Sequence, residues 1–347
     1  MSVPRKPYPV QTSFIVVNWN RRNLLEQCLR SLEQQTVGDF ELILVDNGST
    51  DGSLDCLKEC SLPSVKVVRN PENVGFARAV NQGLQNAQGQ FIALVNNDVH
   101  LDPHWLEEIQ GGFAGDARVG MCAGKILLAH DPRRIDKVGQ VFYPDGQIYG
   151  RGHREEDRGQ YDQVEEALWP DGAAAIYRRE VFAEIGCFDE DFFAYCDDGE
   201  FGLRARLFGW NCLYIPTARA FHHHSATWGE YAARKIFLVE RNRIWLAIKL
   251  LPGRQLALLP FYSAVRYLYS VLALASRQGD MGRASRQGPI GTVIFAVLRA
   301  QASAAGGLVR MWRKRKEIRP RRRISDAELA RLLQRHSISA FELVFSG

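Results

Sequence analysis

QFIALVNNDVHLD, residues 90–102, is the stretch that decides the fold of this chain. Residues 91–95 form a short apolar run, which is typical of a strand buried on both faces of a parallel sheet. The run ends in Asn96, Asn97 and Asp98, and open α/β sheets bind ligands at the carboxyl ends of such strands. Pro103 predicts the start of a helix. The three polar residues alone are equally compatible with a plain turn and helix cap.

The composition is that of an ordinary globular protein. The chain has 347 residues, of which 46% are apolar and 24% charged, and these suffice for one large or two ordinary cores. Its seven cysteines include no CxxC pair, which argues against a disulfide framework or a zinc ribbon and favours a reducing cytosol. The first twelve residues contain no apolar run, so we expect no secretory signal.

Strands and helices alternate through the first hundred residues. Hydrophobic periodicity predicts strands at 13–18, 40–45, 65–68 and 91–95, and helices at 23–34, 51–60 and 75–87. Helices of this length between strands imply crossover connections and therefore a mainly parallel sheet. The predicted fold class is α/β, a Rossmann-like sheet with flanking helices, which is typical of nucleotide sites although fold alone does not define function.

Polar residues follow each of the first strands, and we take them as donor-site candidates. Asp46 stands at the tip of the second strand, where it can accept hydrogen bonds from a base or ribose, while the residues after Gly48 are explained by a capped turn. Arg78 lies near a helix start that offers backbone donors to an anion, although a solvated charge explains it nearly as well. The other candidates are Asn18, Asn47 and Asn97.

A second polar centre lies in residues 186–210. Asp197, Asp198 and Glu200 stand between an aromatic segment and a predicted helix. One of them can cap the helix, but a cap needs only one side chain, and a carboxylate here could act as a general base toward a sugar hydroxyl. Glu200 with Arg204 is more simply an ion pair four residues apart.

The segment 119–171 is less regular, and we interpret it as extra strands and a loop that shape an acceptor site. Its charged run at 151–158 is typical of a solvated loop. Asp171 follows, within a segment of small residues that would allow the backbone to approach a substrate closely. Asp171, Asp197 and Glu200 are therefore candidates for acceptor binding.

Three histidines, residues 222–224, follow another predicted strand at 212–215. A run of three histidines usually lies on the surface. A single histidine together with Asp98 would nevertheless make a mixed oxygen and nitrogen site suited to Mn²⁺ or Mg²⁺.

Several of these segments together resemble family 2 inverting glycosyltransferases, in particular bacterial rhamnosyltransferase-like members. The resemblance covers about residues 12–245. It is carried by VVNWN (16–20), VDNGSTDG (45–52), NVGFARAVNQG (73–83), NNDV (96–99), FDEDFFAYCDDGE (188–200) and the histidine after PTARAF (216–221). Five motifs in this order make the match specific.

The resemblance implies a GT-A fold, a nucleoside diphosphate sugar donor and a divalent metal, Mg²⁺ or Mn²⁺. It places Asp46 at the nucleobase or ribose, Asp98 at the metal, Asp198 as the catalytic base and His222 at the metal or diphosphate. The expected reaction transfers rhamnose from dTDP-rhamnose to a growing cell-surface glycan or lipid-linked acceptor.

Two departures from the family pattern leave the donor sugar open. Asn96 and Asn97 precede Asp98 where many members have two acids, and the chain has DDGE where rhamnosyltransferases often have EDxD. The alternatives are a galactofuranosyl or other UDP-sugar transferase and a non-catalytic nucleotide-sugar-binding module. A sugar nucleotidyltransferase is disfavoured because no Gly-rich phosphate loop follows the first strand.

The composition changes after residue 230. We expect a tail at 1–11, a GT-A domain at 12–230 with a nucleotide-binding half at 12–100 and an acceptor and catalytic half at 101–230, and a helical extension at 231–347. The apolar segments 236–251 and 256–275 are interrupted by arginine and lysine, so interfacial helices are expected rather than spanning ones.

A basic cluster follows the apolar helix predicted at 290–309. Its members are Arg313, Lys314, Arg315, Lys316, Arg319, Arg321, Arg322 and Arg323. These charges favour an anionic leaflet, so we hypothesise a cytoplasmic protein attached peripherally to the inner face of the membrane. The alternative is a packed extension with a solvated basic face. No aromatic interleaving accompanies the cluster, so no nucleic-acid partner is expected.

Overall fold

The computed structural model describes residues 8–62, 64–223 and 232–345. The predicted alternation of strands and helices is confirmed in the first half. Its elements are β1 (Thr12–Asn18), α1 (Arg22–Glu33), β2 (Phe40–Asp46), η1 (Ser53–Glu59), β3 (Val65–Arg69), α2 (Phe76–Asn86) and β4 (Phe91–Asn96). The helix predicted at 51–60 is a 3₁₀ helix, η1.

The second half adds further strands to this sheet, together with helices and a separate two-stranded sheet. They are β5 (Val99–Leu101), α3 (Trp105–Gly111), β6 (Val119–Leu128), β7 (Asp131–Lys137), β8 (Gln140–Phe142), β9 (Ile148–Gly150), β10 (Glu165–Ala167), β11 (Ala174–Arg178), α4 (Arg179–Ile185), η2 (Glu190–Phe192), α5 (Asp197–Leu207) and β12 (Asn211–His222). The separate sheet consists of β8 and β9.

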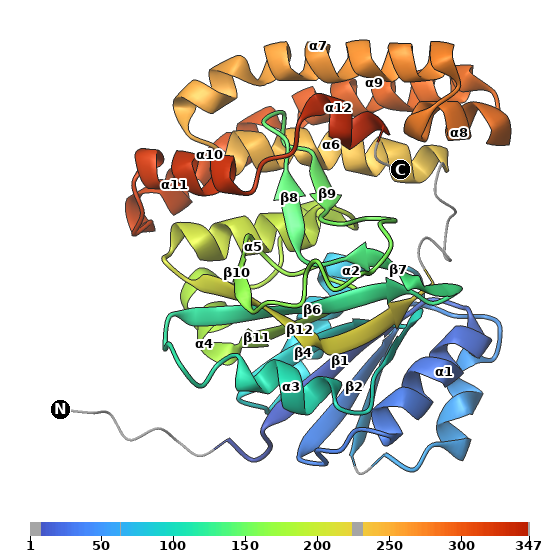
Figure 1. The fold of residues 1–347 in the computed structure, drawn as a ribbon. Coiled ribbons are helices and arrows are strands. Elements are labelled where there is room, and N and C mark those ends of the chain that lie inside the picture. The colour runs from blue at the N-terminus through green and yellow to red at the C-terminus, as the bar shows by residue number, and fades with distance from the viewer. Residues whose placement is uncertain (1–7, 63, 224–231, 346–347) are drawn as a thin grey trace.

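The large sheet has the order β10-β12-β6-β11-β4-β1-β2-β3 (Figure 1). β4, β1, β2 and β3 run parallel, as predicted, while β11 is antiparallel to both β4 and β6. Because the first four strands are parallel, the polar residues that follow them meet at one edge of the sheet. The fold is therefore the predicted mixed α/β sheet with helices on both faces.

Two predicted boundaries differ. After β4 the chain makes a turn at Asn97 and Asp98 and then forms β5, and the following helix begins at Trp105 rather than at Pro103. β12 is three times the length of the strand predicted at 212–215, because it continues to pair with β6 beyond an irregularity between Ile215 and Arg219. Pro216 lies in this irregularity, which is where a strand accommodates a residue without a backbone donor.

The carboxyl-terminal helices form a layer over the sheet domain (Figure 1). They are α6 (Ala233–Leu250), α7 (Gly253–Ser276), α8 (Gly279–Gln287), α9 (Ile290–Gly306), α10 (Leu308–Ile318), η3 (Arg319–Arg321), α11 (Asp326–Arg335) and α12 (Ala340–Phe345). Trp245 and Leu246 of α6 belong to the same buried core as Ile92 and Phe201 of the sheet domain. The boundary predicted at 230/231 lies outside the described residues.

Buried ion pairs join this layer to the tip of the β8–β9 hairpin. Arg266 of α7 lies 2.7 Å from Asp145 through Nε and 2.9 Å from Glu240 of α6 through Nη1. Arg243 also contacts both carboxylates, at 3.3 and 2.8 Å. Burial opposes ionisation of Glu240, but Arg266 and Arg243 overcome this effect and lower its pKa to about 2. One face of α7 is therefore fixed to the domain by charge.

The opposite face of α7 is apolar and exposed. Within the described residues, α7 is long and apolar enough, by length and composition, to cross a membrane. α9 and the helical segment after it meet the same criterion when they are taken together, although a 57° bend separates them. Only 17% of the apolar window of α7 is buried. This differs from the expectation that charged residues interrupt the segment too often for it to span a membrane. The reason is that Arg266 is the only charged residue in the sequence 256–276. Its side chain points inward to Asp145.

Most members of the basic cluster contact other groups of the protein, yet five of the eight stay exposed. Lys314 donates to Asp189 and Asp191, Arg315 is buried and donates to the Ile248 carbonyl, and Arg319 and Arg322 pair with Asp326. Arg321 and Arg323 contact Glu184. The solvated basic face is smaller than the sequence indicates because Lys314, Arg315 and Arg322 are withdrawn from it at least in part; its exposed members are Arg313, Lys316, Arg319, Arg321 and Arg323.

A strained segment precedes the carboxylates of α5. Phe193, Tyr195 and Cys196 have φ values of 65°, 66° and 57°, in the left-handed region that side chains other than glycine rarely adopt. The buried Asn242 of α6 holds the segment: its Nδ2 lies 2.8, 2.9 and 2.7 Å from the carbonyl oxygens of Phe192, Ala194 and Tyr195. α6 thus determines the conformation of the chain that leads into α5.

We expect Asn242→Ala to lower the free energy of unfolding by about 1–3 kcal/mol, because it leaves buried carbonyls without their donor. Asn86→Ala, an exposed helical asparagine whose Nδ2 also meets a carbonyl, should change it by less than about 0.5 kcal/mol. Urea denaturation of both variants measures the difference. Equal values for the two would show that Asn242 does not hold the strained segment.

Candidate active site

One cavity of about 730 Å³ extends from the carboxyl edge of the sheet into the helical layer. Its polar end is lined by residues from the ends of strands and by the start of α5. The sequence candidates that line it are Asn47, Asn97, Asp98, Asp171, Asp197, Asp198 and His222. The structure thus brings together candidates that are more than 170 residues apart in the chain.

Asn18 connects the candidates at the ends of β1, β2 and β4. Its Nδ2 donates to Asp46 Oδ1 (3.1 Å), and its Oδ1 accepts from Asn97 Nδ2 (2.8 Å). The other oxygen of Asp46 accepts from the Ser49 backbone N–H at 3.1 Å, which closes the turn after β2. Asn18 and Asp46 are buried behind Asn97, and the arrangement fixes the direction in which the Asn97 side chain faces the cavity.

Asn47 is held in the cavity wall by the segment before α2. Its Nδ2 lies 3.3 Å from the Gly75 carbonyl and 3.4 Å from Asn73 Oδ1. Gly75 has a φ of 92°, and a Cβ at this position would lie 2.7 Å from the Phe193 carbonyl oxygen, so only glycine fits here. Arg78 does not line the cavity: its side chain is 58% exposed, and its Nε lies 4.0 Å from Glu190.

Asp98 and His222 meet at one corner of the cavity. His222 Nε2 lies 3.3 Å from Asp98 Oδ1, and its Nδ1–H donates to the buried carboxylate of Asp136 at 2.7 Å. Burial disfavours the imidazolium, but Asp98 and Asp136 overcome this effect and raise the pKa of His222 to about 10. Burial likewise opposes ionisation of Asp98, yet His222 lowers the pKa of that carboxyl.

This corner has part of the donor set that a divalent cation needs. Oδ1 of Asp98 is buried, and its contact with His222 does not have hydrogen-bond geometry, so this oxygen has unused capacity to bind a ligand. The Asp136 contact orients the His222 ring as a carboxylate orients a metal-bound histidine. In residues 8–62, 64–223 and 232–345, no group of three or more His, Cys, Asp or Glu side chains is arranged to hold a metal. The residues fit a metal that takes its remaining ligands from a donor diphosphate and water.

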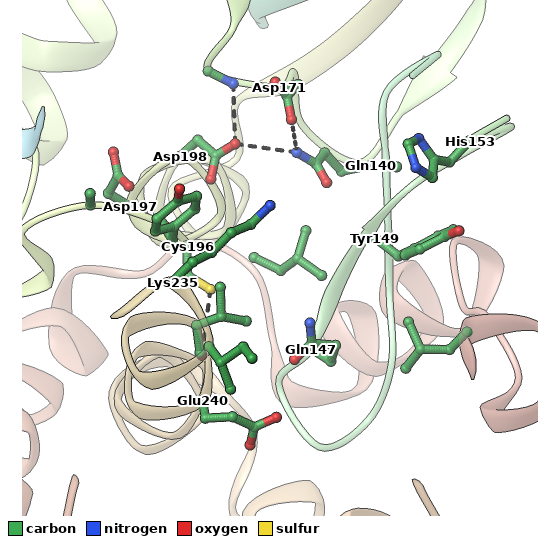
Figure 2. Close-up of a pocket in the computed structure, with 18 of the residues that line it drawn as sticks. Gln140, Gln147, Tyr149, His153, Asp171, Cys196, Asp197, Asp198, Lys235 and Glu240 are labelled. Atoms are coloured by element: carbon green, nitrogen blue, oxygen red, sulfur yellow. Dashed lines mark hydrogen bonds between the residues drawn. The ribbon is translucent and has the colours of Figure 1, made fainter. Parts of the chain in front are cut away.

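Asp198 lies at the start of α5, facing the turn before β11 (Figure 2). Its Oδ2 accepts from the Gly172 backbone N–H at 3.1 Å and from Gln140 Nε2 at 3.2 Å. Gln140 also donates to Asp171 at 2.6 Å, and Lys137 Nζ lies 2.7 Å from the same Asp171 oxygen. Asp171 therefore positions Lys137 and Gln140 beside Asp198.

The two adjacent aspartates differ in basicity. Burial and the neighbouring Asp171 raise the pKa of Asp198 to about 6, against the lowering effect of the Gly172 N–H and Lys137. Burial and Asp198 raise the pKa of Asp197 well above its usual range. Both carboxyls therefore keep a proton to higher pH than an exposed aspartate does. A buried carboxylate that titrates near neutrality is suited to proton transfer.

Glu200 lies in the core rather than in the cavity wall. Arg204 Nε contacts it at 2.9 Å and Lys249 Nζ at 2.7 Å. Burial opposes its ionisation, but Arg204 and Lys249 lower its pKa. The simpler interpretation of Glu200 as an ion pair with Arg204 matches this geometry, and the structure does not place it where an acceptor would bind.

Several cavity residues escaped the sequence analysis. Lys137 and Gln140 line the cavity, and Asp136 contacts His222 behind its wall. All three come from the end of β7 and the start of β8, a region whose short strands have no clear periodicity. His153 lies within the charged run interpreted as a solvated loop, yet its side chain is only 9% exposed and lines the cavity, with Nδ1 3.0 Å from the Asp136 carbonyl oxygen. In the sequence, the only indication that this run reaches the cavity is a histidine, His153, among charged residues.

Comparison with known proteins identifies the class of this fold and site. The model of glycosyl transferase family 2 matches residues 13–186, half of the chain. The chain belongs to this family, and it is a glycosyltransferase.

Relatives within the family are distant. The chain is 24% identical over 266 residues to the N-acetylglucosaminyl-diphospho-decaprenol L-rhamnosyltransferase of Mycobacterium tuberculosis, covering 67% of this chain and 85% of that protein. It is 30% identical over 237 residues to the uncharacterised protein y4gI of Sinorhizobium fredii, covering 62% of this chain and a quarter (25%) of that protein. It is 29% identical to the O-antigen biosynthesis protein RfbC of Myxococcus xanthus, covering 67% of this chain and 20% of that protein.

Solved structures support the fold. The mannosyltransferase PcManGT from Pyrobaculum calidifontis, solved with GDP-Man and Mn²⁺, has a TM-score of 0.53 at 17% identity and covers 90% of this chain and 88% of its own. GalNAc-T7, solved with UDP, GalNAc and Mn²⁺, has a TM-score of 0.58 at 15% identity and covers 75% of this chain and 50% of its own. The fold is therefore of the GT-A kind.

Proposed function

We propose that this chain transfers a sugar from a nucleoside diphosphate donor to an acceptor hydroxyl in a single displacement that inverts the anomeric centre. The observation that carries the proposal is that Asp198 and the Asp98–His222 corner line one cavity with Asn47 and Asn97. A base and a site for a diphosphate therefore face the same space.

Each residue has a distinct role in this proposal. Asp198 accepts the proton of the acceptor hydroxyl as its oxygen attacks, and Gln140 and the Gly172 N–H hold the carboxylate in position. Asn47 and Asn97 bind the donor from the ends of β2 and β4, with Asp46 and Asn18 behind them. Asp98 and His222 would hold Mn²⁺ or Mg²⁺, which supplies charge neutralisation for the departing diphosphate.

Rhamnose from dTDP-rhamnose is the proposed donor sugar, and a lipid-linked saccharide is the proposed acceptor. The relative from Mycobacterium tuberculosis supports both, because its name gives L-rhamnose as the sugar and N-acetylglucosaminyl-diphospho-decaprenol as the acceptor. The exposed apolar side of α7 and α9 supports peripheral attachment to a membrane, where such an acceptor is met. Its side chains include Phe261, Leu268, Ile294, Phe295 and Leu298.

A donor panel with Mn²⁺ or Mg²⁺ tests the proposed transfer. Released nucleoside diphosphate is measured with dTDP-rhamnose, UDP-galactofuranose, UDP-galactose and GDP-mannose, and dTDP-rhamnose should give the highest rate. Asp198→Asn should reduce the rate by about 10²–10⁴-fold while nucleotide binding persists, because it removes the base and leaves the donor contacts. Asp116→Asn, an exposed aspartate, is the matched control. Near-full turnover by Asp198→Asn would contradict its assignment as base.

The kcat/KM of transfer should fall about tenfold for each pH unit below about 6, because the base must be ionised and burial with Asp171 raises the pKa of Asp198 to about 6. Lys137→Met removes a charge that lowers this pKa, so the fall should begin at higher pH. Lys58→Met, at an exposed helical lysine, should leave the profile unchanged. If the pH profile of kcat/KM is the same in Lys137→Met as in the native chain, a group other than Asp198 causes the fall at low pH.

Asp98→Ala should weaken Mn²⁺ binding at least about tenfold in the presence of the nucleoside diphosphate, because it removes the buried carboxylate from the metal corner. Asp102→Ala, a nearby aspartate that does not line the cavity, is the control. Electron paramagnetic resonance of free Mn²⁺ measures binding independently of turnover. Unchanged Mn²⁺ binding in Asp98→Ala would show that the metal binds at a site that does not include Asp98.

A further inference from the structure

The cavity has a second arm that the proposed chemistry does not use. Beyond Asp197 and Asp198 its wall is built by α6, α7, α8, α9 and α12 and is mainly apolar. The polar side chains of this wall are Lys235, Glu240, Arg266, Tyr267 and Ser270. Side chains that line this arm include Val239, Leu274, Ala284, Val293, Val297 and Leu343. The whole cavity, about 730 Å³, lies within the range of about 300–1,000 Å³ that is usual for small-molecule sites.

The apolar arm reaches the outer surface between α7 and α9. Val271 of α7 and Ile294 and Leu298 of α9 all line the cavity, yet they are 62%, 53% and 59% exposed. These residues therefore border the opening of the arm. The exposed Phe295 and Leu272 lie on the same two helices, so the opening is set in an apolar surface.

A positive charge stands where the polar and apolar parts meet. Lys235 of α6 lines the cavity, and Figure 2 shows its side chain reaching past Cys196 toward Asp198 and Gln140. Its ammonium group lies 5.6 Å from the ring centre of Tyr195. A cation that lines the cavity at this point suits an anionic group of a ligand.

We propose that the apolar arm binds the isoprenoid chain of a diphosphate-linked acceptor. The proposal rests on the proposed function, because that function identifies the polar end of the cavity as the place where the acceptor hydroxyl reacts. The sugar hydroxyl lies at Asp198, the diphosphate meets Lys235, and the hydrocarbon leaves along the arm and emerges between α7 and α9. This order of groups matches the order of a base, a cation and an apolar wall in the cavity.

The energetic argument favours a chain that enters the arm over one left in water. Burial of hydrocarbon stabilises a complex roughly in proportion to the apolar area removed from water. An acceptor held only by its sugar and diphosphate would forgo this contribution.

Geranylgeranyl diphosphate serves as a probe that needs no transfer. Isothermal titration below its aggregation concentration should show saturable binding to the full chain. Val297→Trp fills the arm and should weaken this binding at least about tenfold, whereas Val309→Trp, on an exposed helix position outside the cavity, should not. Val293→Trp is a second filling variant, and melting temperatures equal to that of the native chain show that each variant is folded.

Lys235→Met separates the cation from the apolar wall. It should weaken binding of geranylgeranyl diphosphate and leave binding of geranylgeraniol unchanged, because only the diphosphate carries charge. Equal loss for both probes, no effect of either filling variant, or equal affinity for palmitate would overturn the assignment of an isoprenoid diphosphate.

Donor turnover measured on the same preparations distinguishes this inference from the proposed function. Nucleoside diphosphate release without saturable probe binding would contradict isoprenoid binding in the apolar arm and would still support the proposed transferase activity. Saturable, Val297-dependent probe binding without turnover of any donor would support the arm and remove the proposed donor.

Discussion

The contact between Asn242 of α6 and the carbonyls of residues 192–195 is the constraint on which the site depends. It holds Phe193, Tyr195 and Cys196 at positive φ values. Each such conformation costs about 1–3 kcal/mol, which the surrounding contacts must offset. This strained segment leads directly into α5, whose first turn carries Asp197 and Asp198. The helical layer therefore determines where the candidate base lies, because α6 holds the segment that leads into α5.

Buried charges also attach the helical layer to the sheet domain. Arg266, Arg243 and Lys249 are buried and compensated by acidic side chains, so they connect α6 and α7 to the sheet domain. The basic cluster at 313–323 is withdrawn only in part: Arg315 is buried, but five of its eight members stay exposed. The outer side of α7 and α9 is apolar, and residues that line the cavity are exposed there.

The prediction from sequence was most accurate where one residue pattern determines local structure. The apolar run at 91–95 is β4, as predicted, and Asn97 and Asp98 form a turn after it that lines the cavity. Asp136, Gln140 and Lys235 could not be found in this way. They reach the site through β7, β8 and α6, and their positions depend on long-range packing that no local spacing encodes. Arg78, beside the same motifs in sequence, turns to solvent instead.

The sequence by itself determined the family, the parallel half of the sheet and the carboxylates available for chemistry, because strand periodicity and ordered motifs are local properties. Only the tertiary structure decided which of those carboxylates face one another. Asp198 remains beside Asp171 and Lys137 in a cavity, while Glu200, two residues away, is turned into the core between Arg204 and Lys249. The reason is helical geometry: two residues along α5 rotate a side chain by about 200°, from the cavity to the opposite face.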